Sequence, residues 1–275
     1  MSKTALVTGA SSGIGEETAR TLHKLGYTVY AAARRTDRLK QLTAVGIHAL
    51  TMDVTDDESM SSGIEKIITE TGRIDVLVNN AGYGSYGAIE DVSLDEARRQ
   101  FEVNVFGLGR LTQLVLPHMR AQRSGTIINI SSMGGRLTTP LGGWYHATKY
   151  AVEALSDALR METAPFGIDV VVIEPGGIRT EWSGIAADHL EETAEGSAYA
   201  SQIKAVANSM RSESTNKRQS PPSVIADTVE KIVTARKPRT RYVVGFAAKP
   251  LVTLRRILPD RAFDRVISAA LGVRR

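Results

Sequence analysis

The stretch Val7-Thr8-Gly9-Ala10-Ser11-Ser12-Gly13-Ile14-Gly15 decides the fold of this 275-residue chain. A short apolar run, 4–7, precedes it, and an amphipathic segment, 13–25, follows it. Glycines at this spacing allow a sharp turn between a strand and a helix. The exposed N–H groups of the turn and the positive end of the helix can then hold a pyrophosphate. The stretch therefore predicts a dinucleotide-binding α/β fold.

The remaining sequence alternates apolar runs with amphipathic segments. We expect strands over 4–7, 28–33, 48–52, 76–78, 126–130, 169–173 and 242–244, and helices over 13–25, 56–71, 94–121, 143–166 and 223–236. The central strands are apolar at successive positions, as in a parallel sheet that helices cover on both faces. The pattern predicts an α/β fold with a Rossmann-type, doubly wound parallel sheet of about seven strands.

We expect one catalytic domain over residues 1–245, followed by a basic, amphipathic extension over 246–275 with helices at 251–258 and 261–271. The segment 181–222 interrupts the strand–helix alternation and ends in Ser-Pro-Pro. An insertion at this place can cover a cleft at the carboxyl ends of the strands, so we expect a substrate lid. A surface excursion without function is the alternative.

Composition narrows the classes of function. The chain has no cysteine and its five histidines do not cluster, so we expect no disulfide and no metal site. From residue 236 onward, eleven Lys/Arg and two Asp/Glu give a balance of +9; subtracting it from the total of +4 leaves −5 for the rest. The basic tail lacks interleaved aromatic residues, which argues against nucleic-acid binding. Two interpretations of the basic tail remain: a solvated surface, or peripheral contact with an anionic membrane.

The sequence shows neither a signal peptide nor an apolar run long enough to span a membrane. We therefore expect a cytoplasmic protein.

The end of the second expected strand, Ala31-Ala32-Ala33-Arg34-Arg35, bears on the cofactor. NAD-specific sites usually place an acidic residue here to bond the ribose hydroxyl. A small neutral residue fills that position, and two guanidinium groups, which suit a 2′-phosphate, follow it. We expect NADP(H), with Arg34 as its principal contact, and Asp37 keeps NAD(H) as the alternative.

A proton-handling set follows in the second half of the chain. Tyr145 and Lys149 are four residues apart in an expected helix and so share one face. A nearby ammonium lowers the pKa of a tyrosine, which can then exchange a proton with a carbonyl or an alcohol. Ser132 lies 13 residues before Tyr145, where the fifth expected strand ends, and its hydroxyl can hold a substrate oxygen. His146 faces elsewhere on the helix, and we expect no catalytic role for it.

Together these motifs resemble the short-chain dehydrogenase/reductase family in its short, non-extended form, over residues of about 4–181. The landmarks are Thr8-Gly-Ala-Ser-Ser-Gly-Ile-Gly15, Asp53-Val54, Asn79-Asn80-Ala81-Gly82, Asn104, Ser131-Ser132, Tyr145-His-Ala-Thr-Lys149, and Pro175-Gly176 followed by Thr180. The resemblance implies an NADP(H)-dependent oxidoreductase that interconverts a carbonyl and an alcohol by hydride transfer.

The resemblance also implies roles for single residues. Tyr145 is the general acid/base and Ser132 orients the carbonyl. Lys149 lowers the tyrosine pKa and holds the nicotinamide ribose, and Asn104 supports a water that relays protons to Lys149. The implied cofactor contacts are Gly9, Ser11, Ser12, Gly13, Ile14, Gly15, Arg34, Asp53, Val54, Asn80, Ala81, Gly82, Tyr145, Lys149, Pro175, Gly176, Ile178 and Thr180.

Three stretches, 79–84, 149–160 and 172–175, resemble the branch that contains hydroxysteroid and retinol dehydrogenases. That branch implies a bulky apolar substrate such as a steroid, retinoid or lipid. A general carbonyl or 3-oxoacyl reductase is the alternative, and a non-catalytic NADP(H)-binding sensor is a remote one. The family also implies a homo-oligomer that pairs the helices around 105–121 and 145–165.

Two interpretations remain for several residues next to these landmarks. Tyr83, Met133, Trp144 and Trp182 either line the substrate pocket or belong to the core or surface. Two carboxylates next to strands, Asp75 and Glu174, are expected to be structural.

Overall fold

The protein is described by a computed structural model that covers residues 2–273. Its strands are β1 (Thr4–Thr8), β2 (Thr28–Ala33), β3 (His48–Thr51), β4 (Val76–Asn79), β5 (Gly125–Ile130), β6 (Ile168–Pro175) and β7 (Arg241–Val244). They form one parallel sheet in the order β3-β2-β1-β4-β5-β6-β7. The predicted doubly wound parallel sheet is confirmed.

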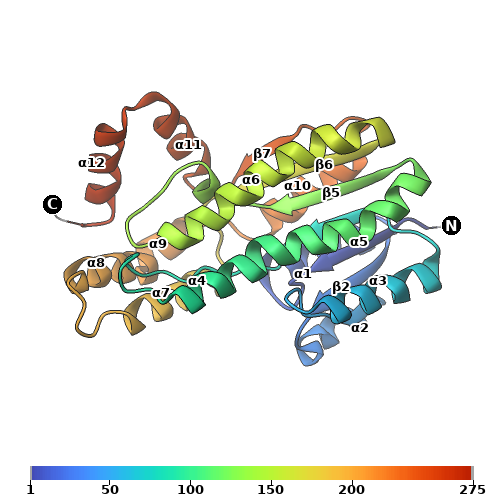
Figure 1. The fold of residues 1–275 in the computed structure, drawn as a ribbon, viewed down its shortest axis with the longest axis horizontal. Coiled ribbons are helices and arrows are strands. Elements are labelled where there is room, and N and C mark those ends of the chain that lie inside the picture. Colours follow the sequence, from blue (N-terminus) through green and yellow to red (C-terminus); the bar gives the residue numbers. More distant parts are fainter. Residues whose placement is uncertain (1, 274–275) are drawn as a thin grey trace.

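Helices cover both faces of the sheet (Figure 1). They are α1 (Gly13–Lys24), α2 (Lys40–Thr43), α3 (Asp57–Thr71), α4 (Leu94–Phe101), α5 (Gly107–Gln122), α6 (Gly143–Thr163), α7 (Trp182–Glu192), α8 (Ala200–Arg211), α9 (Glu213–Arg218), α10 (Ser223–Thr234), α11 (Ala248–Ile257) and α12 (Asp260–Ala270). Alternate residues of β1 point to opposite faces: Ala5 and Val7 pack with α1, α2 and α10, whereas Leu6 packs with α3 and α5.

The strand order places a cleft where the site was expected. β1 pairs with β2 on one side and with β4 on the other, so the chain leaves β1 and β4 in different directions. In open α/β sheets, ligands bind at the carboxyl ends of the strands at such a switch point. The glycine turn that follows β1 lies at this point.

The prediction of one continuous helix over 94–121 is wrong in one detail. A π-helical segment, η2 (Glu102–Phe106), separates α4 from α5, and Asn104 lies inside it. A π turn inserts one residue into the helix and shifts the direction of the side chains, and such turns occur often at functional sites. One inserted residue hardly changes the apolar pattern of the two flanking helices, so the insertion was not predictable from that pattern.

The segment expected as a lid, 181–222, is largely helical and consists of α7, α8 and α9. Beyond β7, α11 and α12 begin three residues and one residue earlier than expected. In Figure 1, α11 lies near β7 and α12 lies next to α8. Phe263 and Ile267 of α12 pack on Leu137. Residues 274–275 of the expected extension lie outside the described residues.

The basic tail is divided in the structure. Because β7 runs from the amino edge of the sheet to the carboxyl edge, the basic residues at 236–239 lie at one edge and those of α11 and α12 at the other. Within residues 2–273, no helix is both long and apolar enough to cross a bilayer. Nor do three or more His, Asp or Glu side chains of that range gather as a metal site.

Candidate active site

The glycine turn is built so that side chains cannot replace its glycines. Gly9 and Gly13 have φ values of +64° and +56°, in the left-handed region that favours glycine. A Cβ on Gly9 would lie 2.9 Å from the Cα of Ala81, and one on Gly15 would overlap the Gly9 carbonyl oxygen. Beside the start of α1, the backbone of Gly9 therefore lies close to the backbones of Gly15 and Ala81.

Side chains from β1 and the end of β4 hold the turn in place. The Thr8 hydroxyl accepts hydrogen bonds of 3.0 Å from the backbone N–H groups of both Asn80 and Ala81. The Asn80 side-chain amide donates to the carbonyl oxygens of Thr8, at 2.9 Å, and Gly9, at 3.2 Å. Asn80 thus fixes the shape of the turn through its side chain.

A cleft of about 380 Å³ opens next to the turn. Of the predicted cofactor contacts, it is lined by Gly9, Ser11, Ser12, Arg34, Asp53, Val54, Ala81 and Gly82. One carboxylate oxygen of Asp53 is engaged by the backbone N–H and the hydroxyl of Thr55, at 3.0 and 2.8 Å. The structure therefore brings together predicted residues from the ends of β1, β2, β3 and β4.

Other predicted cofactor contacts lie around the cleft without lining it: Gly13, Ile14, Gly15, Asn80, Pro175, Gly176, Ile178 and Thr180. A Cβ on Gly13 would lie 3.0 Å from the Thr180 methyl group, so Thr180 reaches the glycine turn. Ile178 is 8% exposed and packs in the core between the sheet and α10. Gly176 has no room for a side chain because the Phe246 carbonyl passes against it.

The charges of the cleft favour an anion at the end of β2. Four arginines, Arg34, Arg35, Arg38 and Arg99, line it. Arg38 pairs with Glu181 at 3.3 Å, whereas Arg34 and Arg35 form no ion pair within residues 2–273. Unpaired guanidinium groups beside a phosphate-sized turn suit a phosphate, which they can bind through charge-assisted hydrogen bonds.

The predicted catalytic residues meet at the same edge of the sheet. Lys149 is 8% exposed, and its amine donates a 3.0 Å hydrogen bond to the carbonyl oxygen of Ile130 at the end of β5. The Lys149 nitrogen lies 5.9 Å from the centre of the Tyr145 ring. A Cβ on Gly82 would lie 3.7 Å from the same nitrogen, so the lysine also lies near the cleft, which Gly82 lines.

Asn104 is held by the π-helical segment close to Lys149. Its side-chain oxygen accepts from the Tyr83 N–H at 3.0 Å, and its amide donates to the Tyr83 carbonyl at 2.9 Å and to the Thr148 hydroxyl at 3.1 Å. A Cβ on Gly82 would lie 3.0 Å from the Asn104 oxygen. Asn104 thus ties the end of β4 to α6.

Burial dominates the protonation of the tyrosine–lysine pair. It raises the pKa of Tyr145 to about 12, and a hydrogen bond to Ser132 acts in the opposite direction. It lowers the pKa of Lys149 to about 8, and the charge of Glu153 acts against this shift. Burial outweighs the expected lowering of the tyrosine pKa by Lys149, whose amine bonds Ile130 and lies 5.9 Å from the ring centre.

His146 supports the loop after Ser132. The Thr139 N–H donates to His146 Nε2 at 3.1 Å, so the proton resides on Nδ1, which donates to the Gly134 carbonyl at 3.0 Å. Burial lowers the pKa of His146, which keeps the ring neutral. These contacts give the ring a structural task.

An aromatic wall surrounds the phenol. The Tyr145 ring is 5.6 Å from the Tyr86 ring and 5.3 Å from the Trp182 ring, measured between centres. Gly84 permits the close approach of Trp182, because a Cβ there would overlap the indole. Residues of α7 and α8 join the same apolar cluster, and Tyr145 is only 7% exposed. The segment expected as a lid therefore lies over the phenol.

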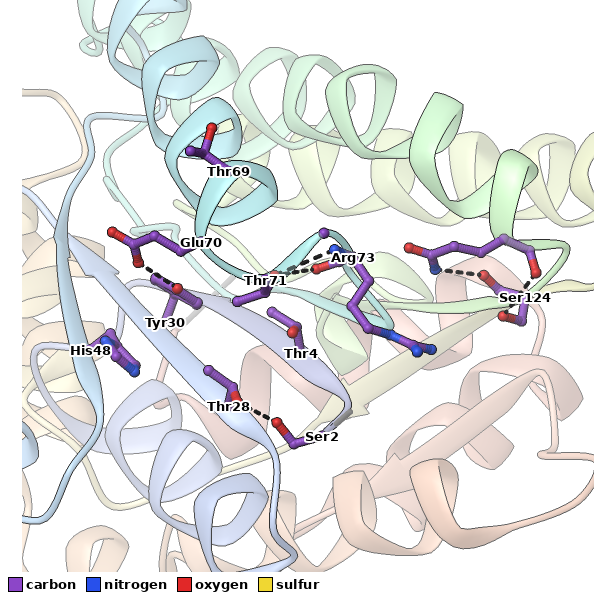
Figure 2. Close-up of a pocket in the computed structure, with 12 residues that line it drawn as sticks. Ser2, Thr4, Thr28, Tyr30, His48, Thr69, Glu70, Thr71, Arg73 and Ser124 are labelled. Carbon is purple, nitrogen blue, oxygen red and sulfur yellow. Dashed lines mark hydrogen bonds between the residues drawn. The ribbon is translucent and has the colours of Figure 1, made fainter.

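A larger cavity, of about 990 Å³, lies at the opposite edge of the sheet (Figure 2). Its lining comes from the starts of β1, β2 and β3 and from the end of α3, and it includes none of the predicted site residues. The polar groups there bond one another: the Tyr30 hydroxyl donates to Glu70 at 2.6 Å, and the hydroxyls of Ser2 and Thr28 are 2.7 Å apart. The smaller cleft at the carboxyl edge is the candidate active site.

Comparison with known proteins agrees with this geometry. A family model described as short chain dehydrogenase matches residues 3–190. The chain belongs to the short-chain dehydrogenase/reductase family. As a member of this family, it is an enzyme, an oxidoreductase that acts on CH–OH groups with a nicotinamide cofactor.

Related members of the family match nearly the whole chain. The 3-ketodihydrosphingosine reductase of Bacteroides thetaiotaomicron is 36% identical over 98% of both chains. The NADPH-dependent 3-dehydrocapnine reductase of Ornithobacterium rhinotracheale is 35% identical over 95% of both chains. The crystal structure of a short-chain dehydrogenase from Streptomyces avermitilis is 33% identical, covers 100% of this chain and 99% of its own, and superposes with a TM-score of 0.82.

The structure adds residues to this short-chain dehydrogenase/reductase site that the sequence did not single out. Arg38, Arg99, Glu181, Ile185 and His189 line the candidate cleft, and Tyr86 packs on the phenol. Most of them come from helices or loops on which charged side chains are ordinary, so no local signal distinguished them. Of the four residues left open, Tyr83 lines the cleft and Trp182 packs on Tyr145.

Proposed function

We propose that this oxidoreductase reduces a bulky apolar ketone or aldehyde with NADPH. The observation that carries the proposal is the meeting of two features at one edge of the sheet. A glycine turn with two unpaired arginines adjoins a buried Tyr145–Lys149 pair that lies under an aromatic wall. Reduction is the direction that we assign, because the two relatives named above are both described as reductases.

The residues of the cleft fit NADP(H). The close-packed turn of Gly9, Gly13 and Gly15 leaves room for a pyrophosphate at the start of α1. Arg34, assisted by Arg35, would hold the 2′-phosphate, and Asp53 and Val54 would flank the adenine. Ala81 and Gly82 would support the nicotinamide half, and Thr180 would bond its carboxamide. When bound, the cofactor supplies the hydride.

The protein's own groups handle the proton. Tyr145 holds a proton over a wide pH range because its pKa is about 12, and we assign it the donation of that proton to the substrate oxygen. The Ser132 hydroxyl, which acts to lower the pKa of Tyr145, would orient that oxygen. Lys149 would hold the nicotinamide ribose and would pass a proton back to the phenolate. Asn104 would support a water that returns a proton to Lys149.

The walls around Tyr145 favour an apolar substrate. The cluster contains Tyr86, Leu141 and Trp182 together with residues of α7 and α8. An apolar ketone gains by leaving water for such surroundings, whereas a charged one loses hydration. A steroid-, retinoid- or lipid-like compound, as in the hydroxysteroid and retinol dehydrogenase branch, is therefore our first choice, and a general carbonyl or 3-oxoacyl reductase is the alternative.

We also propose a cytoplasmic homo-oligomer that pairs α5 and α6 between copies. Large apolar side chains of this region face solvent: Phe106, directly before α5, is 56% exposed and Met161 on α6 is 66% exposed. Burying them between copies would remove apolar area from water. Light scattering of the purified protein tests this proposal, and a monomer at micromolar concentration contradicts it.

Steady-state kinetics test the proposed reaction. We would measure NADPH oxidation with trans-1-decalone and 2-dodecanone as apolar probes and with ethyl acetoacetate as a small polar ketone. The proposal predicts saturation with the apolar probes and higher kcat/KM for them. Preference for ethyl acetoacetate favours the general reductase. Tight NADPH binding with no turnover of any probe favours the non-catalytic sensor and overturns the proposal.

A further inference from the structure

A buried carboxylate that the proposed reaction does not use lies next to the candidate active site. Glu153 follows Lys149 by four residues on α6, so the two side chains share one face of the helix. Glu153 is 6% exposed, and Lys149 is 8% exposed. A carboxylate at such depth is costly unless charged partners and hydrogen bonds compensate for the lost water.

Arg241, at the start of β7, supplies that compensation. Its Nε donates to Glu153 at 3.0 Å, and its Nη2 donates to Asp157, one turn further along α6, at 2.7 Å. The same Nε lies 3.3 Å from a carboxylate oxygen of Glu174, on β6. The guanidinium therefore fixes Glu153 between α6 and the edge of the sheet.

Glu174 is the second buried carboxylate of this group. It is fully buried, and Arg136 donates to it at 3.1 Å from the loop that follows Ser132. Burial, and next the charge of Glu153, raise the pKa of Glu174. Glu174 therefore takes up a proton more readily than an ordinary glutamate.

The loop that carries Ser132 packs against Glu153 as well. A Cβ on Gly135 would lie 3.0 Å from the Glu153 side chain and 3.0 Å from the Lys149 carbonyl oxygen. One oxygen of Glu153 has no hydrogen-bond partner among residues 2–273. Glycine at 135 thus lets the carboxylate lie close to the catalytic loop with part of its charge unneutralised.

Few other charges face Lys149. On α6 the groups that titrate near it are Tyr145, one turn before, and Glu153, one turn after. Asn104 of the π-helical segment lies near the amine, and the Ile130 carbonyl at the end of β5 accepts its hydrogen bond; both groups are uncharged. Glu153 is therefore the negative charge that acts on the amine.

We propose that Glu153 is a positioning residue for Lys149: its carboxylate, held by Arg241, keeps the buried amine in its charged, hydrogen-bonding form. This inference rests on the role proposed for Lys149, since an ammonium can donate three hydrogen bonds and a neutral amine attracts neither ribose oxygens nor a phenolate as strongly. Burial pulls the pKa of Lys149 down to about 8, and Glu153 opposes that change.

The test titrates Lys149 directly and needs no substrate. In protein labelled with ¹³C-lysine, the ε-methylene signal of Lys149 is assigned by its loss in Lys149→Met, and its shift is followed by NMR from pH 6 to 11. The amine should titrate near pH 8 in the wild type. In Glu153→Gln, which keeps the shape and one oxygen for Arg241, the midpoint should fall by about one pH unit.

Asp157→Asn is the matched control. It also removes a carboxylate that bonds Arg241 at 2.7 Å on the same helix, but two turns from Lys149. We expect no change in the Lys149 midpoint for this variant, and we expect Glu153→Asp, which keeps the charge, to restore most of the wild-type value. An unchanged midpoint in Glu153→Gln, or an equal fall in Asp157→Asn, would overturn the inference. Absence of turnover with intact titrations would count against the proposed function alone.

Discussion

The Lys149 nitrogen lies 5.9 Å from the centre of the Tyr145 ring, on the same face of α6. Each side chain is anchored by a different part of the fold. Lys149 bonds the carbonyl at the end of β5, whereas Tyr145 packs between Tyr86 and Trp182. The pair is therefore held at the junction of two regions, the cofactor cleft and the aromatic wall, and the predictions below separate the contributions of the two.

Replacing Arg34 with Ser should weaken NADPH binding and leave NADH binding nearly unchanged. Arg34 lines the cleft at the end of β2 and has no ion-pair partner within residues 2–273. Loss of its hydrogen bonds to a charged phosphate costs about 1.5–3 kcal/mol, or about 10- to 100-fold in Kd. Fluorescence titration with both cofactors checks this. Arg98→Ser is the control, because Arg98 pairs with Asp95 on the exposed side of α4. Equal loss for both cofactors would refute the assignment to the 2′-phosphate.

Adding a methyl group at Gly15 should damage both the turn and NADPH binding. The new Cβ would overlap the Gly9 carbonyl oxygen and press on the Asn80 side chain. Overpacking of this kind costs about 1–3 kcal/mol of unfolding free energy. Gly109→Ala on α5 is the matched control: its Cβ meets nothing within 4 Å, so it should be neutral or stabilising by up to about 1 kcal/mol. Urea unfolding distinguishes the two, and equal stabilities would contradict the described packing.

Replacing Trp182 with Ala should raise KM for apolar ketones more than it lowers kcat. The indole packs 5.3 Å from the phenol and closes the site from α7, but it donates no proton to the reaction. Removing this large aromatic side chain loses about 2–3 kcal/mol of binding free energy from apolar contact with the substrate. This loss corresponds to roughly 30- to 150-fold in kcat/KM. The measurement is steady-state kinetics with trans-1-decalone. A fall confined to kcat would show that Trp182 has another role.

The unfolding free energy should decrease as pH falls through about 6.5, the ordinary pKa of histidine. Burial lowers the pKa of His146 in the folded state, so below pH 6.5 the unfolded chain binds a proton that the folded chain does not. By linkage, the unfolded state then gains in stability. His146→Gln should show a flatter dependence between pH 7.5 and 5.5 in urea unfolding. His118→Gln, on α5, is the control and should keep the wild-type slope. If the His146 variant also keeps that slope, the inference that the buried His146 ring is neutral in the folded state is wrong.

The fold was predictable because its signals are local. The glycine turn and the apolar strands gave every strand of the sheet to within two residues at each end. The π-helical turn at Asn104 was not predictable, since one inserted residue hardly changes the apolar pattern of α4 and α5. The helices within 181–222 were also missed, because their sequence is rich in small and polar residues.

The candidate site was predictable only in part. The predicted catalytic set and eight of the eighteen predicted cofactor contacts are brought to one edge of the sheet. The sequence did not single out Arg38 or Arg99 as lining the cleft, because their positions depend on how distant segments pack. The direction of the Tyr145 pKa shift differs from the expectation for the same reason: it follows from burial under α7 and α8, which spacing along the chain does not encode.

The most direct test of the account is the turnover of Tyr145→Phe. The variant keeps the ring, and with it the packing against Tyr86 and Trp182, but lacks the proton that we assign to the substrate oxygen. With the ketone that the wild type reduces fastest, kcat should fall by about 10²- to 10⁴-fold, while Kd for NADPH changes little. Activity within a few-fold of the wild type, at an unchanged Kd, would contradict the account.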